Sequence, residues 1–472
     1  MMEMGAFPLL EWVLIAEREL LLFAGIFLLI GVADELAVDL LWFWMRLTGR
    51  IRTRRISRLA AEQSSLLGPA ALMIPTWQED GVIGHTIRHA RAVWPQERLT
   101  MFIGCYRNDL RTIAAAMQAA KGDPRVKVVV HEVDGPTTKA DCLNRLLTVL
   151  SLEEGLRGEA FRMVMLHDAE DMVDPAALAL CDRALEDADF IQLPVLPQPH
   201  PASPFVSGHY CDEFAEAHGK ALPVRQALGT GLPAAGVGCA FSRRLLDRMA
   251  QRARAAGEGA TGPFSSESLT EDYELGLRVR QFGARSLFLR ARGEDGELVA
   301  TRAYFPDTLE AAIRQKARWI QGIALQGWDR LGWTGDPLEM WMRLRDRRGP
   351  FAAIVLAVSY LLLILVIGLG LLRWTGALPP FPARPLIRFL VAANIIGLGW
   401  RVLMRFAFTA REYGWGQGIL AIFRIPVANL IAILAGRRAL TAYVKSMKGV
   451  APKWDKTIHH AHPTQNYCKK DE

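Results

Sequence analysis

Residues 162–174 read Arg-Met-Val-Met-Leu-His-Asp-Ala-Glu-Asp-Met-Val-Asp, and this stretch decides how the middle of the chain folds. An apolar run at 163–166 is followed at once by the acids Asp168, Glu170, Asp171 and Asp174. A parallel sheet delivers side chains in this way to its carboxyl edge, where α/β folds bind ligands. Neighbouring carboxylates can share a hard divalent cation. The competing interpretation is a polar turn in which Asp174 caps the helix that follows.

Strand and helix patterns alternate on both sides of this stretch. The sequence predicts strands at 70–74, 99–104, 126–131, 162–166 and 189–195, and helices at 81–93, 109–120, 139–150 and 272–282. This order implies a doubly wound, mostly parallel sheet with right-handed crossovers. Neither a GxGxxG nor a Walker sequence is present, so a dinucleotide or P-loop site is not indicated. The glycine-rich segment 228–242 can bring backbone close to a ligand or can be a plain connection.

The chain has 472 residues, about half of them hydrophobic, and its apolar residues gather near 9–45 and 351–435. Segments 20–45, 351–373 and 385–406 are long enough to span a membrane. The arginines 46, 50, 52, 54, 55 and 58 follow the first span, and the positive-inside rule explains them better than nucleic-acid binding. Scattered cysteines without a CxxC pair argue against a zinc site or a disulfide framework. The middle domain is therefore expected in the cytoplasm.

Residues 418–435 form a further apolar stretch, which contains Arg424 and Pro426. A fourth crossing here would carry the basic tail outside, against the charge rule. We therefore predict an interfacial or re-entrant helix. Histidines 459, 460 and 462 in the tail are only a weak metal signal without a second ligand cluster.

Two further motifs carry chemical groups. Glu271 and Asp272 follow Thr270 at the start of a predicted helix, where capping alone could explain them. Gln315, Arg318 and Trp319 lie within one turn of an amphipathic helical stretch at 308–330. The plain alternative for that stretch is a surface helix docked on the domain.

Five segments, in this order, resemble the processive, membrane-embedded glycosyltransferases of family 2, which have the GT-A fold of cellulose and hyaluronan synthases. They are 74–79 (Ile-Pro-Thr-Trp-Gln-Glu), 139–144 (Lys-Ala-Asp-Cys-Leu-Asn), 168–171 (Asp-Ala-Glu-Asp), 270–272 (Thr-Glu-Asp) and 315–319 (Gln-Lys-Ala-Arg-Trp). Segments 106–109 (Tyr-Arg-Asn-Asp) and 454–457 (Trp-Asp-Lys-Thr) are similar to the bacterial phage-adsorption protein B branch. The chain departs from the family at 103–106, where Ile-Gly-Cys-Tyr replaces the usual Asp-Asp-Gly-Ser.

The resemblance implies an α/β GT-A domain inserted between transmembrane helices, and it assigns roles to residues. Asp272 corresponds to the catalytic base, with Glu271 beside it. Mg²⁺ or Mn²⁺ is expected on Asp168, with Glu170 or Asp171 as the second ligand. Gln315, Arg318 and Trp319 would serve the acceptor and the diphosphate. The nucleotide sugar would be bound by Pro75, Trp77, Glu79, Asn108, Asp109, Lys139, Asn144 and Asp168.

By this resemblance the protein is an inverting, metal-dependent glycosyltransferase. It would move a sugar from a nucleoside diphosphate sugar, a UDP-linked hexose or N-acetylhexosamine, onto a growing cell-surface or secreted glycan. It would lie in the bacterial inner membrane in contact with lipid, as a multi-pass protein with a cytoplasmic catalytic domain. An outer-membrane export partner is compatible with this role, and nucleic acid is not expected.

Two other classes of protein share part of the pattern. A polyprenyl-phosphate monosaccharide synthase would share the first three motifs but would not need Gln315, Arg318 and Trp319. A non-enzymatic phage receptor or assembly protein would have no reason to keep acids at both 168–171 and 271–272. The glycan-forming enzyme therefore explains the most residues.

The expectations divide the chain into five parts. Residues 1–58 hold the first transmembrane helix and a basic juxtamembrane segment, and residues 59–307 form the cytoplasmic GT-A domain. Residues 308–345 are amphipathic interface helices, and 346–410 hold two transmembrane helices. Residues 411–472 hold the interfacial or re-entrant helix and a basic cytoplasmic tail.

Overall fold

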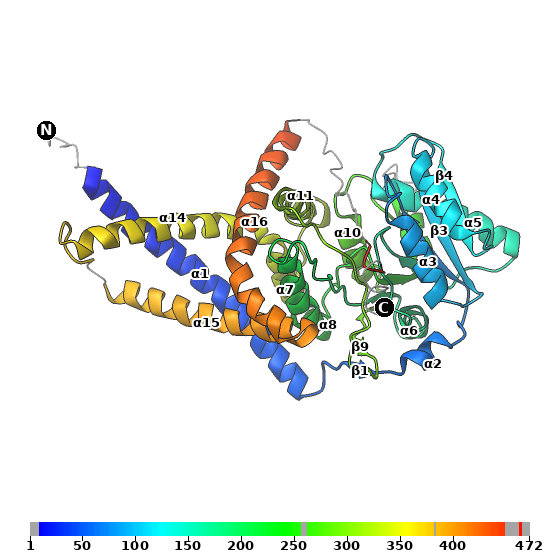
Figure 1. The fold of residues 1–472 in the computed structure, drawn as a ribbon, viewed down its shortest axis with the longest axis horizontal. Coiled ribbons are helices and arrows are strands. Elements are labelled where there is room, and N and C mark those ends of the chain that lie inside the picture. The colour runs from blue at the N-terminus through cyan, green and yellow to red at the C-terminus, as the bar shows by residue number, and fades with distance from the viewer. Residues whose placement is uncertain (1–8, 256–261, 382–383, 449–461, 465–472) are drawn as a thin grey trace.

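The computed structural model describes residues 9–255, 262–381, 384–448 and 462–464. Long helices occupy one end of the molecule and an α/β domain the other, with shorter helices between them (Figure 1). The chain leaves the long helices after α1, builds the α/β domain and then returns to them.

Within the described residues, seven strands form one sheet in the order β4-β3-β2-β5-β7-β6-β8. Only β7 runs antiparallel to its neighbours β5 and β6. The strands are β2 (Ala70–Pro75), β3 (Leu99–Tyr106), β4 (Val126–His131), β5 (Met163–Leu166), β6 (Phe190–Gln192), β7 (Cys239–Ser242) and β8 (Ser286–Phe288). A small second sheet pairs β1 (Arg54–Arg55) with β9 (Ala291–Arg292). The prediction of a mostly parallel sheet is confirmed.

Helices cover both faces of this sheet, as a doubly wound fold requires. Alternate residues of β2 point to opposite faces: Leu72 and Ile74 join one buried core, and Met73 joins the other. The first core also holds Ile87 of α3, and the second holds Leu146 of α5. The covering helices are α3 (Ile83–Val93), α4 (Leu110–Ala120), α5 (Lys139–Arg157), α6 (Ala177–Ala184), α9 (Arg243–Ala255) and α10 (Glu271–Gln281), and the short α2 (Arg58–Glu62) leads into the domain.

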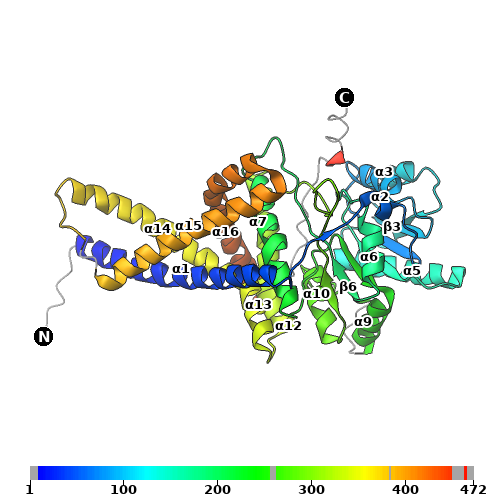
Figure 2. The ribbon, with the colours of Figure 1, turned by 90° about the horizontal axis from the view of Figure 1, so that it is seen from below.

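Shorter helices lie between the sheet domain and the long helices (Figure 2). The amphipathic helical stretch predicted at 308–330 is divided into α11 (Leu309–Trp319), the π-helix η2 (Ile320–Gln326) and α12 (Gly327–Leu331). π-Helical turns are rare and are often found at functional sites. The other elements of this layer are α7 (Gly208–Glu216), the π-helix η1 (Ala217–Ala221), α8 (Leu222–Ala227) and α13 (Pro337–Arg347).

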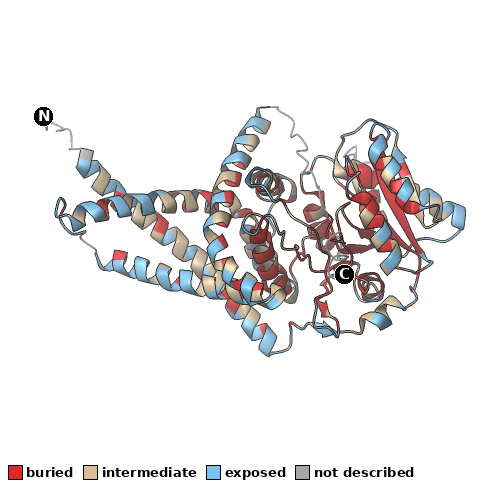
Figure 3. Cartoon of the chain, in the orientation of Figure 1, coloured by how far each residue is buried: buried red, intermediate tan, exposed pale blue. Residues whose placement is uncertain are grey.

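Four helices in the described part of the chain are long and apolar enough to cross a membrane: α1 (Leu9–Leu47), α14 (Gly349–Trp374), α15 (Pro385–Tyr413) and α16 (Trp415–Met447). Their outward surfaces are exposed, in contrast to the buried sheet (Figure 3). Ile364 and Ile396 are 70% and 73% exposed. Apolar surface of this extent is expected to contact lipid, which supports membrane association.

The stretch predicted at 418–435 belongs to the longer helix α16, which continues through Pro426. Most of α16 runs across the direction of α14 in Figure 1. The buried Arg424 donates hydrogen bonds to Asp212 of α7 at 2.9 Å and to the backbone oxygen of Pro204 at 2.6 Å. Its charge is therefore satisfied by the interface layer, and the interfacial placement of α16 stays a prediction.

Candidate active site

Lys139 joins the acids that follow β5 to the start of α5. Its Nζ lies 2.5 Å from a carboxylate oxygen of Asp168. Thr138 caps α5 by accepting from the N–H of Asp141, whose side chain accepts from the N–H of Thr138 in turn. This capping box fixes the first turn of the helix. The ammonium is thereby held at the carboxyl edge of the sheet.

The same ammonium faces the second acidic pair. Burial opposes the charge of Lys139, but attraction to Asp168, Glu271 and Asp272 raises its pKa overall. The structure therefore brings together acids that lie about a hundred residues apart in the chain. The two acidic motifs form one site.

Glu271 and Asp272 occupy the first turn of α10. Burial is the main cause that raises the pKa of both carboxyl groups, and Lys139 opposes it. The charge of Asp272 adds to the effect on Glu271, whose pKa rises to about 7. A carboxyl group that titrates close to neutral pH is suited to accept a proton during a reaction.

The glycine-rich segment passes directly against Asp272. Gly236 has a φ of +75°, and a Cβ on it would lie 2.2 Å from Oδ2 of Asp272. A Cβ on Gly276 of α10 would lie 2.2 Å from the backbone nitrogen of Ala234. The glycine-rich segment therefore lies against Asp272 on one side, and its predicted approach to a ligand stays a prediction.

The two candidates for a second metal ligand have different surroundings. Asp171 is buried, and its Oδ2 accepts from the N–H of Asp168 at 2.9 Å and lies 2.8 Å from Nδ1 of His167. Glu170 is half-buried, and burial together with the charges of Asp168, Glu79 and Asp171 raises its pKa. Mutual repulsion of this kind is relieved by a cation. Asp168 and Glu170 could together hold such a cation.

No group of three His, Cys, Asp or Glu side chains in the described residues is arranged as a metal site. Two carboxylates still fit a metal that takes its remaining oxygen ligands from substrate phosphates and water, as Mg²⁺ commonly does.

Several predicted donor-binding residues shape the loops at this edge. Asn108 exchanges hydrogen bonds with Gly135, at 2.9 Å and 2.8 Å. Asp109 caps α4 and accepts from the N–H of Gln78 at 2.5 Å. Trp77 meets the ring of Tyr106 edge to face at 5.4 Å. These contacts order the loops that follow β2 and β3, and the predicted residue Pro75 ends β2.

Asn144 binds the segment that precedes Glu271. Its amide donates to the backbone oxygen of Phe264 at 2.8 Å and accepts from the Phe264 N–H at 3.2 Å. A Cβ on Gly262 would lie 2.2 Å from its Oδ1. Asn144 holds this loop, and its predicted place beside the diphosphate stays a prediction.

The helix α11 carries Gln315, Arg318 and Trp319. Of these three motif residues, Arg318 acts on the acids of the site. The charge of Arg318 lowers the pKa of Glu271 and of Asp272 against the effect of burial. Gln315 is buried. Trp319 lies in an aromatic cluster, 6.0 Å from the ring of Tyr210 and near Phe214 and Phe305.

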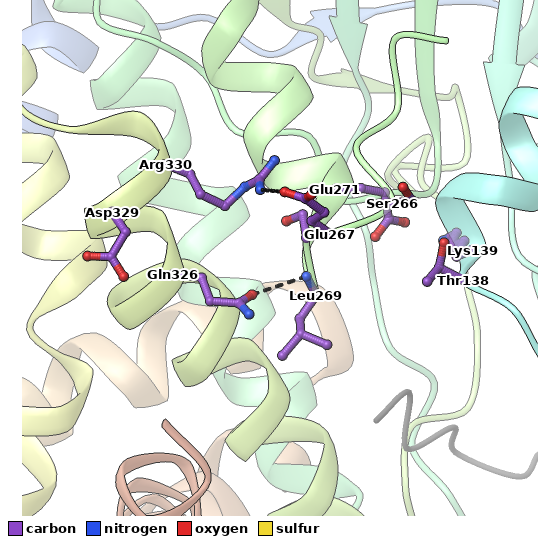
Figure 4. A pocket seen from close by; sticks show the side chains of 10 residues that line it. Thr138, Lys139, Ser266, Glu267, Leu269, Glu271, Gln326, Asp329 and Arg330 are labelled. Atoms are coloured by element: carbon purple, nitrogen blue, oxygen red, sulfur yellow. Dashed lines mark hydrogen bonds and ion pairs between the residues drawn. The ribbon is translucent and has the colours of Figure 1, made fainter. Parts of the chain in front are cut away.

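A cavity of about 440 Å³ opens beside Lys139 and Glu271 (Figure 4). Arg330 binds Glu274 at 2.9 Å and Glu267 at 3.0 Å, and Gln326 accepts from the N–H of Leu269 at 3.3 Å. The lining residues are Thr138, Lys139, Ser266, Glu267, Ser268, Leu269, Glu271, Gln326, Asp329 and Arg330. Sequence reasoning missed Gln326 and Arg330. Their spacing of one helical turn on the predicted amphipathic stretch was the available signal.

The tail returns to the acidic segment. His462 is buried, its ring stacks on His85 of α3 at 5.8 Å, and its Nε2 lies 3.3 Å from the backbone oxygen of Asp171. Burial lowers the pKa of His462 to about 4, so the ring is neutral. The predicted motif at 454–457 and the histidines 459 and 460 lie outside the described residues.

A mostly parallel, doubly wound sheet with two acidic motifs and a lysine at its carboxyl edge defines a GT-A glycosyltransferase. The chain belongs to glycosyltransferase family 2, because the family described as "Glycosyltransferase like family 2" matches residues 68–322, more than half of the chain.

Two relatives are the bacteriophage adsorption protein B of Escherichia coli K12 and the bacteriophage N4 adsorption protein B of Escherichia coli O157:H7. Each is 34% identical over 462 residues, covering 92% of this chain and 61% of the relative. The chain thus spans 61% of the length of these curated relatives. The resemblance to the phage-adsorption protein B branch is confirmed.

Among solved structures, the chain is similar to a mannosyltransferase from Pyrobaculum calidifontis in complex with GDP-Man and Mn²⁺. The TM-score is 0.47 at 15% identity, over 85% of this chain and 98% of that one. A glucosyl-3-phosphoglycerate synthase from Mycobacterium tuberculosis has a TM-score of 0.36 at 16% identity, over 61% of this chain and 90% of that one.

Proposed function

We propose that this family 2 glycosyltransferase is an inverting enzyme that uses a nucleoside diphosphate sugar to extend a cell-surface or secreted glycan. The observation that carries the proposal is the place of Lys139, which binds Asp168 and faces Glu271 and Asp272. A lysine between two acidic motifs is suited to a diphosphate leaving group beside a general base. The expected donor is a UDP-linked hexose or N-acetylhexosamine.

The leaving diphosphate is bound by positive groups at the sheet edge. Lys139 and Arg318 supply fixed charges where negative charge develops. Mg²⁺ or Mn²⁺ held by Asp168 and Glu170 would neutralise the phosphate oxygens further. The loops ordered by Trp77, Asn108 and Asp109 form the nucleotide side of the pocket.

Asp272 is the general base of the proposed reaction. It takes the proton of the acceptor hydroxyl while that oxygen bonds to the anomeric carbon. The bond from the anomeric carbon to the diphosphate breaks in the same displacement, and Lys139 and Arg318 hold the departing oxygens. One displacement inverts the configuration, so an α-linked donor gives a β-glycoside.

The acceptor occupies the cavity beside Glu271 in this proposal. Gln326, Asp329 and Arg330 offer hydrogen-bonding groups to sugar hydroxyls along its wall. Trp319 is half-buried in its aromatic cluster, and its stacking on the acceptor sugar stays a prediction.

We place the protein in the bacterial inner membrane, as a multi-pass protein with its catalytic domain in the cytoplasm. The arginines after α1 support this orientation through the positive-inside rule. Export of the product by an outer-membrane partner belongs to the same proposal.

The test is a donor screen with the purified full chain, Mn²⁺ and isotope-labelled nucleoside diphosphate sugars, followed by mass analysis of the products. A lengthening glycan supports the proposal. A lipid-linked monosaccharide would instead indicate a polyprenyl-phosphate sugar synthase. No transfer from any donor would favour the non-enzymatic phage-receptor or assembly role.

A further inference from the structure

A second cavity, of about 460 Å³, lies at the end of α1, apart from the proposed active site. The turn after α1, the helix α8 and the edge strand β8 enclose it. In Figure 1 the end of α1 lies where the long helices give way to the catalytic domain. The cavity is lined by Gly49, Arg50, Ile51, Arg52, Arg54, Pro223, Gln226, Ala227, Leu287, Phe288, Leu289 and Arg290.

The lining carries positive charge in excess. Among its described residues there are four arginines and no acid. Arg290 has a carboxylate partner, because its guanidinium binds Glu412 of α15 at 2.6 Å. Arg50, Arg52 and Arg54 form no ion pair with any residue in the described part of the chain. Guanidinium groups without a carboxylate partner are well matched to phosphate oxygens.

Local structure holds these arginines in place. Gly49 ends the helical segment with a φ of +72°, which turns the chain back toward the cavity. Arg52 donates from Nε to the backbone oxygen of Gly49 at 2.8 Å, and its terminal nitrogens stay available. The guanidinium of Arg50 lies 4.8 Å from the centre of the Trp44 ring. The positive groups therefore lie beside an aromatic side chain of the kind found at membrane surfaces.

An apolar stripe leads down α1 to the same point. Leu40, Trp44 and Leu47 are 59%, 47% and 87% exposed. Their spacing of four and three residues places them on one face of the helix. A soluble anion would make no use of such a stripe, whereas the acyl chains of a lipid would cover it. The stripe therefore indicates that the phosphate belongs to a lipid headgroup.

We propose that this cavity binds the phosphate headgroup of an anionic membrane phospholipid, whose acyl chains lie along Leu40, Trp44 and Leu47. Arg50, Arg52 and Arg54 bind the phosphate oxygens. Because Arg54 belongs to β1, which pairs with β9, the bound lipid fastens the catalytic domain to the membrane surface. The inference requires α1 to lie in the membrane and does not depend on the proposed transfer reaction.

The experiment titrates the purified full chain, in detergent micelles, with dioctanoyl phosphatidylglycerol. Dioctanoyl phosphatidylcholine, glycerol phosphate and inorganic phosphate are titrated in parallel. The triple variant R50Q/R52Q/R54Q should weaken phosphatidylglycerol binding on the order of a hundredfold, at roughly fivefold for each arginine. The matched control R244Q/R252Q/R254Q removes three exposed arginines from α9 and should bind as the wild type does.

Two further variants keep the test decisive if the triple variant does not fold. Arg52→Gln alone should weaken binding roughly fivefold. R50K/R52K/R54K keeps the charge and should retain most of the affinity. Unchanged phosphatidylglycerol binding in Arg52→Gln and the triple variant would overturn the proposal. Equally tight binding of glycerol phosphate or inorganic phosphate would overturn the lipid as the source, and equal binding of phosphatidylcholine would overturn the role of charge.

Discussion

Two clusters of buried carboxylates in this chain differ in how their charge is balanced. At the junction between the long helices and the interface layer, Lys220 binds Glu216 at 2.8 Å, and Arg405 binds the same carboxylate at 3.0 Å. Burial raises the pKa of Glu216, but Arg405, Arg401 and Lys220 lower it to about 2 overall. Glu216 is therefore ionised and paired with both Lys220 and Arg405.

At the sheet edge the balance is reversed. Burial raises the pKa of Glu170 and of Glu271, and neighbouring carboxylates add to the effect. Lys139 is the cation that these acids share most closely. A site in which acids outnumber cations could bind a further cation, whereas a balanced network of ion pairs holds helices together. Within one molecule, the acids at the sheet edge therefore suit ligand binding, and the acids at the helix junction serve packing.

The largest expected effect is at the proposed base. Asp272→Asn should lower the transfer rate by about 10²–10⁴-fold, because the acceptor hydroxyl loses its proton acceptor. Donor affinity, measured by titration with the nucleotide sugar, should change little. The control Glu310→Gln alters an exposed acid on α11 and should keep wild-type activity. An active Asp272→Asn enzyme would remove Asp272 from the mechanism.

Breaking an ion pair of the balanced junction should lower the stability of the protein. Lys220→Met leaves the carboxylates of Glu216 and Asp39 without this partner, and breaking a buried pair costs about 3–5 kcal/mol. Thermal unfolding of the full chain in micelles should show a lower midpoint, with normal activity per folded molecule. Lys121→Met, at an exposed lysine, should leave the midpoint unchanged. Equal midpoints for both variants would show that the junction is not held by charge.

Substitutions at the metal site should distinguish between the two candidate ligands, Glu170 and Asp171. Glu170→Gln should weaken Mn²⁺ binding by at least about tenfold, since even groups that only support a ligand cost 10–100-fold. Asp171→Asn should change Mn²⁺ affinity less, because its carboxylate already accepts from Asp168 and contacts His167. Calorimetric titration with Mn²⁺ compares the affinities of the two variants. Unchanged affinity in both variants would return the segment to a polar turn.

The smallest effect is the pH dependence. Burial raises the pKa of the proposed base Asp272, so Asp272 is protonated at higher pH than a free carboxyl group, and kcat/KM should fall as the pH is lowered, by up to about tenfold per unit. Glu271→Gln removes a neighbouring carboxylate from Asp272, and the fall should move to lower pH. Rate profiles between pH 5 and 9 give the midpoints. A profile of Glu271→Gln that coincides with the wild type would show that the two carboxyl groups titrate independently.

Much of the fold was predictable because its signals are local. The runs 70–74 and 163–166 are short, buried and apolar, and the helix α5 between them begins at a recognisable cap, Thr138. The division of 308–330 into three helical segments was not predictable. A π-helix depends on packing around it, here of Gly322 against Thr270, and leaves no periodic mark in the sequence.

The sequence by itself determined the order of the motifs, the class of the fold and the types of residue in the site. Only the tertiary structure decided what each side chain does. It turned Asn144 toward Phe264, enclosed Trp319 among aromatic rings and paired Lys220 with Asp39, 181 residues away. The reason is physical: charge balance and burial arise from partners that are distant in the chain, and local sequence patterns do not record them.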